Sequence, residues 1–145
     1  MEKVNRAIGR DLPISTKQSI EICSYIRGRS VKKSKYILQK VIEKEMAIPF
    51  KRFNKDMGHR PGRMAAGRYP IKSCQNILKI LNSAESNAVS NGSNVDNLFI
   101  KNAIANKASQ PLHTGRKIRR KMKRAHVEII LEEKNDRKEV HKPKN

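Results

Sequence analysis

The sequence predicts an α+β domain from which a long, basic β-hairpin extends. Three segments repeat apolar residues at helical spacing, which predicts three helices. Two apolar, β-prone runs, residues 98–100 and 127–131, flank a segment in which seven of the nine residues from 116 to 124 are basic. Two strand-like runs joined in this way are typical of an extended hairpin, here over about residues 97–133.

Composition limits both the core and the partners. With 145 residues, of which 37% are hydrophobic and 4% aromatic, the chain has room for one domain, about residues 1–133, with a small aliphatic core. Its 33 Lys and Arg residues against 13 Asp and Glu give a formal net charge of +20, which favours a polyanionic partner. No apolar run approaches the ~20 residues needed to span a membrane, and the first residues lack the apolar region of a signal peptide. Cys23 and Cys74 match no metal or redox spacing, so we expect buried thiols in a reducing, cytoplasmic compartment.

The first helix is predicted over about residues 16–27. Before it, residues 4–12 form a short mixed segment that fits either an edge strand or an ordered tail. Ser15 and Gln18 have the spacing of a capping box, and Gly28 is a typical helix stop.

Two further helices follow. Ser30 is suited to cap the second, whose apolar residues repeat through 31–42. The third runs over about residues 71–90 and is followed by Gly92, which favours a left-handed stop. The basic turn at 27–33, between the first two helices, fits a phosphate contact and a solvated turn equally well.

Residues 48–70 are predicted to form a long loop without regular structure. Loops of this length in compact domains are usually functional or disordered. Six Lys and Arg residues are interleaved here with Phe50, Phe53 and Tyr69, and no acid follows Asp56 within the loop. Arginine forks hold phosphate oxygens and aromatic rings stack on unpaired bases, so the loop favours contact with RNA.

Six short blocks carry a family resemblance. They are Ile-Arg-Gly-Arg at 26–29, Pro-Phe-Lys-Arg-Phe-Asn at 49–54, Gly-Arg-Tyr-Pro-Ile-Lys-Ser at 67–73, Asn-Ser-Ala-Glu-Ser-Asn-Ala at 82–88, Val-Asp-Asn-Leu at 95–98 and His-Val-Glu-Ile-Ile-Leu at 126–131. Together, and in this order, they resemble the universal large-subunit ribosomal protein twenty-two family in its archaeal and eukaryotic cytosolic form. The resemblance covers about residues 5–133. It implies three helices packed on a small antiparallel sheet, with one long protruding β-hairpin.

The resemblance also implies a function. In that family the hairpin threads through ribosomal RNA, and its tip lines the nascent-peptide exit tunnel. The protein is therefore expected to be a cytoplasmic, structural component of the large ribosomal subunit. Its expected partners are large-subunit ribosomal RNA, neighbouring large-subunit proteins and the nascent peptide that passes the tip. The residues expected to bind RNA are Arg27, Arg29, Lys32, Lys51, Arg52, Arg60, Arg63, Arg68, Lys72, Lys107, Arg116, Lys117, Arg119, Arg120, Lys121, Lys123 and Arg124.

The turn of the hairpin is where the sequence departs from the family. Eukaryotic relatives carry an Arg-rich run early in the hairpin, but here Ser-Gln-Pro-Leu-His-Thr occupies residues 109–114. Because Pro and Gly suit a turn, we place the turn near 111–115 and the returning arm at 116–124. The residues expected to face the tunnel are Pro111, Leu112, His113, Thr114, Gly115 and Arg116. The polar residues 134–145 are expected to form a disordered tail.

The sequence also bears on two other classes of function, an enzyme and a free nucleic-acid-binding module. Catalysis is not expected, because the four histidines are scattered and the sequence has no metal-ligand cluster, glycine-rich phosphate loop or carboxylate pair. Glu85 on the third helix is the one acid in an unusual setting, and an ion pair on the helix surface explains it. Neither a cofactor nor a metal is therefore expected. The alternative to a ribosomal component is a free RNA- or DNA-binding module, such as an assembly factor, which charge alone does not exclude.

Overall fold

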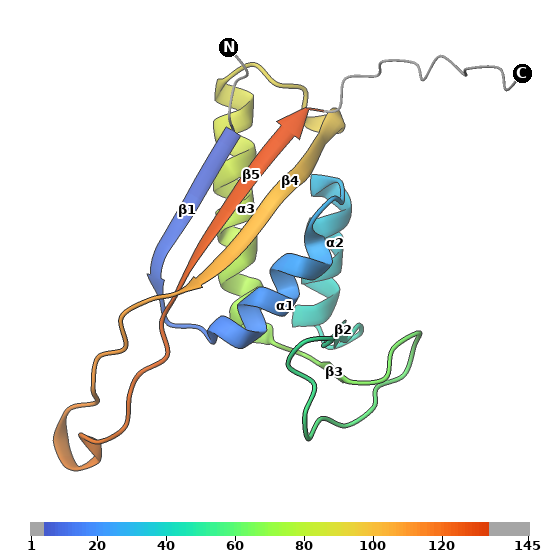
Figure 1. Ribbon diagram of the computed structural model, residues 1–145. Helices are drawn as coiled ribbons and strands as arrows, with labels where there is room; N and C mark the ends of the chain where they lie inside the picture. The colour runs from blue at the N-terminus through green and yellow to red at the C-terminus, as the bar shows by residue number, and fades with distance from the viewer. Residues whose placement is uncertain (1–4, 134–145) are drawn as a thin grey trace, which may run out of the picture.

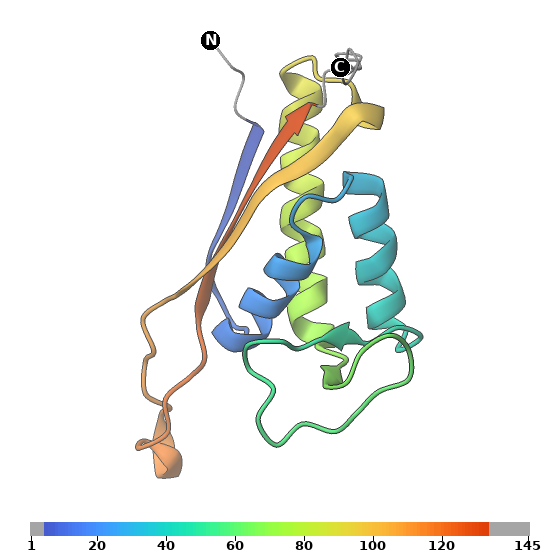
Figure 2. The ribbon, with the colours of Figure 1, turned by 45° about the vertical axis from the view of Figure 1, so that its right-hand side comes forward.

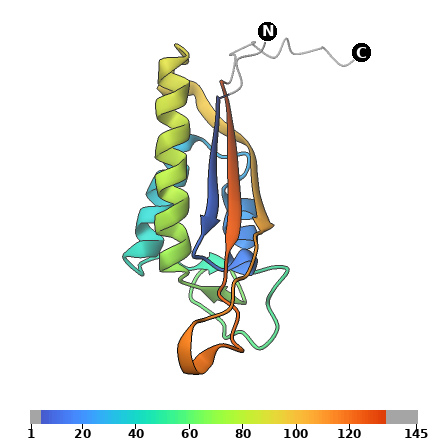
Figure 3. The ribbon, with the colours of Figure 1, turned by 90° about the vertical axis from the view of Figure 1, so that its left-hand side faces the viewer.

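A three-stranded antiparallel sheet forms one layer of the molecule, and three helices cover one face of it (Figures 1 and 3). The computed structural model describes residues 5–133. The sheet consists of β1 (Asn5–Leu12), β5 (Ala125–Glu133) and β4 (Leu98–Lys107), in the order β1-β5-β4. The helices are α1 (Thr16–Ile26), α2 (Val31–Ile42) and α3 (Ile71–Ser90). The predicted α+β fold with three helices and a small antiparallel sheet is confirmed, whereas the predicted tail at 134–145 lies outside the described residues.

The helix ends agree with the sequence signals in all but one case. The Ser30 hydroxyl accepts a hydrogen bond from the Lys33 N–H, and both Gly28 and Gly92 have a φ of +75°, as left-handed stops require. The predicted capping box is wrong, because Ser15 makes no side-chain cap. The Gln18 side chain instead accepts a hydrogen bond from the Ser73 hydroxyl at 3.2 Å, which ties α1 to the start of α3.

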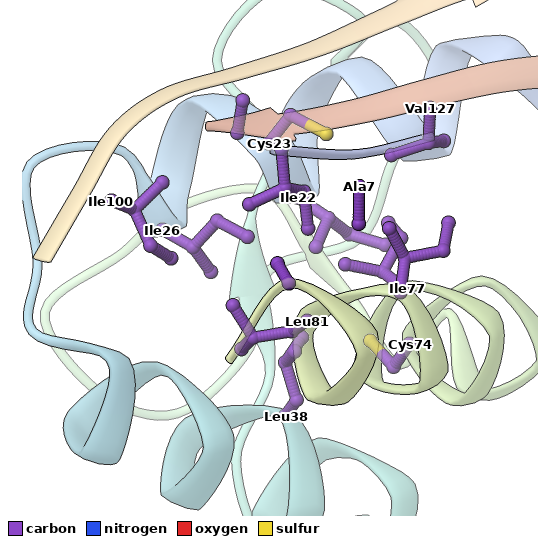
Figure 4. Close-up of a cluster of buried hydrophobic side chains, with 14 of the residues drawn as sticks. Ala7, Ile22, Cys23, Ile26, Leu38, Cys74, Ile77, Leu81, Ile100 and Val127 are labelled. Carbon is purple, nitrogen blue, oxygen red and sulfur yellow. The ribbon is translucent and has the colours of Figure 1, made fainter. Parts of the chain in front are cut away.

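The core lies between the helices and the sheet (Figure 4). α3 packs against β1 and β5, α1 packs against β4, and α2 packs on α3. The side chains that meet there are aliphatic, as composition predicts, and Ile22, Leu38, Leu81, Ile100 and Val127 are fully buried. Cys23 and Cys74 are buried, unpaired thiols, as expected.

Strand register explains two features that the sequence did not decide: the role of residues 4–12 and the imperfect alternation in β4. β1 is an edge strand that pairs with β5 from Asn5 opposite Leu131 onward, so the edge-strand reading of this segment is correct. In β4 the register with β5 shifts between Ile100 and Asn102. This shift changes which alternate residues face the helices, so that Ala103 is buried instead of Asn102. The imperfect alternation in this arm is the result.

The two segments with the strongest basic character extend from the same end of the molecule (Figures 1 and 2). One is the segment between the two-residue strands β2 (Ile48–Pro49) and β3 (Gly67–Arg68), and the other joins β4 to β5. Two single-turn 3-10 helices complete the described chain, η1 (Val95–Asn97) before β4 and η2 (Gly115–Lys117) between β4 and β5. Within residues 5–133, no helix is both long enough and apolar enough to cross a membrane.

Candidate nucleic-acid interface

The arm between β4 and β5 is only partly a β-ladder. The two strands pair regularly from Leu98 opposite Glu133 to Lys107 opposite Ala125. Beyond them, residues 108–124 extend past the body, and the arms are joined by sparser backbone contacts (Figure 2). These are the hydrogen bonds from the N–H of Ala108 to the carbonyl of Arg124 (3.2 Å), of Met122 to Pro111 (2.8 Å) and of His113 to Arg120 (2.9 Å). Side chains therefore project from a narrow, two-chain arm.

The turn of the arm lies later in the chain than predicted. Leu112 pairs with Lys121 across the arm, and η2 forms the apex. Pro111 and Leu112 consequently belong to the outgoing arm, while Arg116 lies at the apex and not in the returning arm. The physical reason is that the Pro111 carbonyl is already engaged across the arm, whereas Gly115, with a φ of +76°, takes the left-handed conformation.

The base of the arm is fixed to the body through Asp11, which has a φ of +50° in the irregular part of β1. A guanidinium nitrogen of Arg124 donates to the Asp11 carbonyl at 2.8 Å, and the Asp11 N–H donates to Nδ1 of His126 at 3.1 Å. The Thr16 hydroxyl donates to the Arg124 carbonyl at 3.3 Å. These contacts set the direction in which the arm leaves the sheet.

The segment between β2 and β3, residues 50–66, is named the central loop here. Its two flanking strands pair with each other, which closes its base, and the Arg60 N–H donates to the Ala65 carbonyl at 3.0 Å within it. The prediction that residues 48–70 lack regular structure is therefore wrong at 48–49 and 67–68, which form β2 and β3. Strands of two residues leave no periodicity that a sequence can show.

Glu21 of α1 holds the start of the central loop. Its side chain accepts hydrogen bonds from three successive backbone N–H groups, those of Lys51 (3.2 Å), Arg52 (2.7 Å) and Phe53 (2.8 Å). Only 4% of the residue is exposed. A buried carboxylate is costly unless its oxygens are hydrogen-bonded, and these three donors supply that compensation. Sequence analysis missed this residue, although an acid between Ile20 and Ile22 on a half-buried helix was a usable signal.

The aromatic residues predicted to stack on bases, Phe50 and Phe53 in the central loop and Tyr69 just after β3, divide into two groups. Phe50 is 4% exposed and belongs to the core, so the prediction that its ring stacks on a base is wrong. Phe53 and Tyr69 are half-buried, and each lies near a cation. The Arg52 guanidinium is 5.2 Å from the centroid of the Phe53 ring, and that of Arg60 is 5.5 Å from the Tyr69 ring.

Three hollows gather most of the cations that were predicted from the sequence, and together they form what we call the basic end. The hollow between α1 and the central loop is lined by Arg27, Arg29, Lys51 and Arg63. The hollow beside the start of α1 is lined by Lys17, Arg52, Lys55, Arg68 and Lys123. The hollow beside the start of α3 is lined by Lys72, Arg120, Lys121, Lys123 and Arg124. Lys123 lines two of the hollows, and Phe50 and Asn54 are also shared, so the three hollows lie next to one another.

Some predicted residues lie outside the hollows. Lys32 pairs with Asp96 on an exposed part of the surface, where such a pair contributes little free energy. Lys107, Arg116 and Arg119 are exposed along the arm, Arg60 lies against Tyr69, and the backbone of Lys117 forms part of η2. Sequence analysis missed Lys17, whose position on α1 carries no signal beyond its charge.

Arg27 and Arg29, like Arg124, line a hollow and also make internal hydrogen bonds. Arg27 donates to the Ala103 carbonyl and Arg29 to the Tyr25 carbonyl, both at 2.7 Å. A guanidinium carries five N–H donors, so one internal bond orients the group without preventing contact with an anion. Glu85 pairs with Lys35 of α2, which agrees with the ion-pair explanation given from the sequence. No group of three or more His, Cys, Asp and Glu residues in the described part of the chain is placed to hold a metal ion.

The fold and the charge distribution define a class of protein: a small, strongly basic α+β domain with one cationic end and an extended arm. The family within this class is shown by comparison with known proteins. The model of the ribosomal protein L22p/L17e family matches residues 7–132, and the chain belongs to that family.

Individual relatives agree with the family match. The protein of Archaeoglobus fulgidus is 42% identical over 125 residues, which cover 85% of this chain and 76% of the relative. That of Thermofilum pendens is 38% identical over 144 residues, which cover 91% of each chain. That of Methanocaldococcus jannaschii is 39% identical over 139 residues, which cover 91% of this chain and 89% of the relative. Each of these relatives is described as large ribosomal subunit protein uL22.

Proposed function

We propose that this protein is a structural component of the large ribosomal subunit in the cytoplasm, where it binds and organises large-subunit ribosomal RNA. Membership of the L22p/L17e family supports the ribosomal assignment. The observation that carries the RNA-binding assignment is the convergence of cations at the basic end. Cations from α1, the central loop, the start of α3 and the returning arm line three neighbouring hollows, although these segments are far apart in sequence.

The proposed mechanism is electrostatic scaffolding. The basic end neutralises phosphates where RNA segments converge, and the arm reaches between them with the cations of its apex and returning chain. Each phosphate contact adds roughly 0.7 to 0.9 to the salt slope of binding, so affinity falls steeply as ionic strength rises. Neighbouring large-subunit proteins are further partners in this assignment.

The arm has a second proposed role, at the nascent-peptide exit tunnel. We infer that residues 111–116 face the tunnel, with Arg116 foremost because it lies in the 3-10 turn at the apex. The narrow construction of the arm supports this role, since two chains joined by sparse backbone bonds fit a space that a globular domain does not.

The experiment that tests RNA scaffolding removes charge from the arm alone. Replacing Arg119, Arg120 and Lys121 with alanine leaves the core and the base of the arm untouched, because Arg124, which bonds Asp11, is retained. We expect a folded variant that is incorporated poorly into large subunits, measured by co-sedimentation after a moderate salt wash. The matched control replaces Lys33, Lys79 and Lys101, which are exposed and line none of the three hollows.

The control is expected to sediment with large subunits as the unaltered protein does. Normal sedimentation of the arm variant contradicts RNA scaffolding by the arm. If the unaltered protein stays away from large subunits, it acts as a free RNA- or DNA-binding module instead.

A further inference from the structure

Glu21 is an exception among the acids of a strongly basic protein. It is almost fully buried, yet it lines the hollow that also contains Arg27, Arg29, Lys51 and Arg63. A negative charge at that place opposes the attraction of phosphate by Coulomb's law. Glu21 should therefore make a contribution that offsets this unfavourable charge, and the contacts of its carboxylate provide one.

The three N–H groups that Glu21 accepts belong to consecutive residues at the start of the central loop. Such a run of backbone donors forms a concave anion site, and here the anion is a side chain of the same molecule. On the preceding side, Phe50 is buried in the core and its N–H donates to the Ala66 carbonyl at 3.0 Å. Residues 50–53 are thus held from both sides, while the side chains of Lys51 and Arg52 are exposed.

In this arrangement the backbone is held by the protein while the side chains stay available to a ligand. The backbone of residues 51–53 is fixed by Glu21, and the cationic side chains of Lys51 and Arg52 point to different hollows, the first beside Arg63 and the second beside Lys123. A loop that is ordered before binding loses less conformational entropy when its ligand arrives. Fixing the backbone of this short segment therefore pre-orders one cation in each of the two hollows.

We propose that Glu21 is a positioning residue for RNA binding, which pre-orders Lys51 and Arg52 by holding the backbone of the central loop. The inference rests on the proposed function, because it names a residue through which the same basic end binds RNA. It goes beyond the cation pattern, because the residue concerned is an acid that does not contact RNA itself.

The test is the Glu21→Gln variant of the full chain, with protein-free large-subunit ribosomal RNA as the probe. The amide keeps one acceptor but turns an NH₂ group toward backbone donors, so the three contacts cannot all persist. We expect faster hydrogen exchange at the amides of residues 51–53 and about tenfold weaker RNA binding, the effect of one charge-assisted contact. The salt slope should also fall, by roughly 0.7 to 1.8 for the loss of one or two phosphate contacts.

The direction in which RNA affinity changes distinguishes a positioning role of Glu21 from a simple effect of net charge. Glu85→Gln, the matched control, removes an equal charge from α3 at the pair with Lys35, and Glu85 lines none of the three hollows. It should bind RNA as well as the unaltered protein or slightly better. Glu21→Gln should bind more weakly despite the same gain in net charge. If Glu21→Gln binds as tightly as the control, or if its amides stay protected, the proposal is wrong.

Two further variants exclude a merely structural role. In a Lys51→Ala/Arg52→Ala background, adding Glu21→Gln should weaken RNA binding no further, because the cations that it positions are already absent. Additive effects would overturn the proposal. Glu21→Asp keeps the charge but is one methylene shorter, and it should weaken binding in the same direction even if Glu21→Gln folds poorly. If the unaltered chain itself fails to bind the RNA, the proposed function fails, and that result is distinct from every outcome above.

Discussion

Cys23 on α1 and Cys74 on α3 lie in the hydrophobic core, and burial raises the pKa of each thiol to about 12. For Cys23 the nearby Arg27 lowers the pKa by a smaller amount. Because the folded-state pKa is raised above the ordinary value of 9.0, the neutral thiols favour the folded state. This contribution is fully present below about pH 9 and is lost as the pH rises toward 12.

We expect neither thiol to react with a thiol-specific reagent in the folded protein at about pH 8, where an exposed cysteine reacts readily. Both should react once denaturant unfolds the chain. The measurement is the absorbance released by the reagent with and without denaturant, and a variant with both cysteines replaced by alanine serves as the blank. Equal rates in the two conditions would show that the thiols are accessible in the folded state.

At the scale of single residues, helical spacing predicted burial well and chemical type predicted it poorly. On α3, Cys74, Ile77, Leu81, Ala84 and Ala88 of the predicted stripe are buried, and Leu78 is partly buried. Glu21 is of a type that favours solvent, and Phe50 was assigned a binding role because it lies in a cationic loop, yet both are buried. The segments that contain Glu21 and Phe50 pack against each other, although they lie about 30 residues apart in sequence. Local pattern carries no information on such a pairing.

At the scale of elements, the arms of the hairpin were predictable and its turn was not. Apolar runs marked the strands that became β4 and β5, whereas the position of the turn depends on register. A register shift between Ile100 and Asn102 changes which residues face each other, and no residue type in the sequence marks it. The same limit applies to β2 and β3, whose two residues each are too few to form a pattern.

The proposed tunnel role can be tested by shortening the arm. Deleting residues 115–118 leaves Thr114 and Arg119 as a two-residue loop between the paired His113 and Arg120. We expect large subunits to assemble, because the basic end and the base of the arm are intact. Elongation arrest by stalling peptides and sensitivity to tunnel-binding drugs should change, because the apex no longer reaches the tunnel wall.

The control for this deletion keeps the length of the arm and replaces residues 115–118 with glycine and serine. It distinguishes the reach of the arm from the chemistry of Arg116. Unchanged arrest and unchanged drug sensitivity in the shortened variant would count against a tunnel-facing turn.

At the scale of the whole molecule, charge is unevenly distributed. Several acids pair with lysine or arginine outside the three hollows, among them Glu128 with Arg6 and Glu132 with Lys101 on the sheet. Of the acids in residues 5–133, Glu21 is the one that lines a hollow of the basic end, and its carboxylate is occupied by backbone donors. The net charge of +20 was evident from composition, but its concentration at one end depends on the fold.

This distribution predicts how salt affects binding to large-subunit ribosomal RNA. If Arg119, Arg120 and Lys121 each contact a phosphate, replacing all three with alanine should reduce the slope of log K against log salt by about 2 to 3. Replacing Lys33, Lys79 and Lys101 should leave the slope nearly unchanged, although the net charge falls equally. The measurement is a binding titration at several salt concentrations. Equal slopes for the two variants would mean that net charge, and not placement, drives binding.

The order β1-β5-β4 also determines when this protein can fold during its own synthesis. β5 is the central strand but the last to be made, and its partners include Asn5, which pairs with Leu131 at the far end of the chain. Until β5 is complete, β1 and β4 have no strand to pair with, and the part of α3 that packs on β5 stays uncovered. A product that stops before residue 125 therefore lacks the sheet entirely. Loss of the last nine described residues therefore removes the central strand on which both β1 and β4 depend.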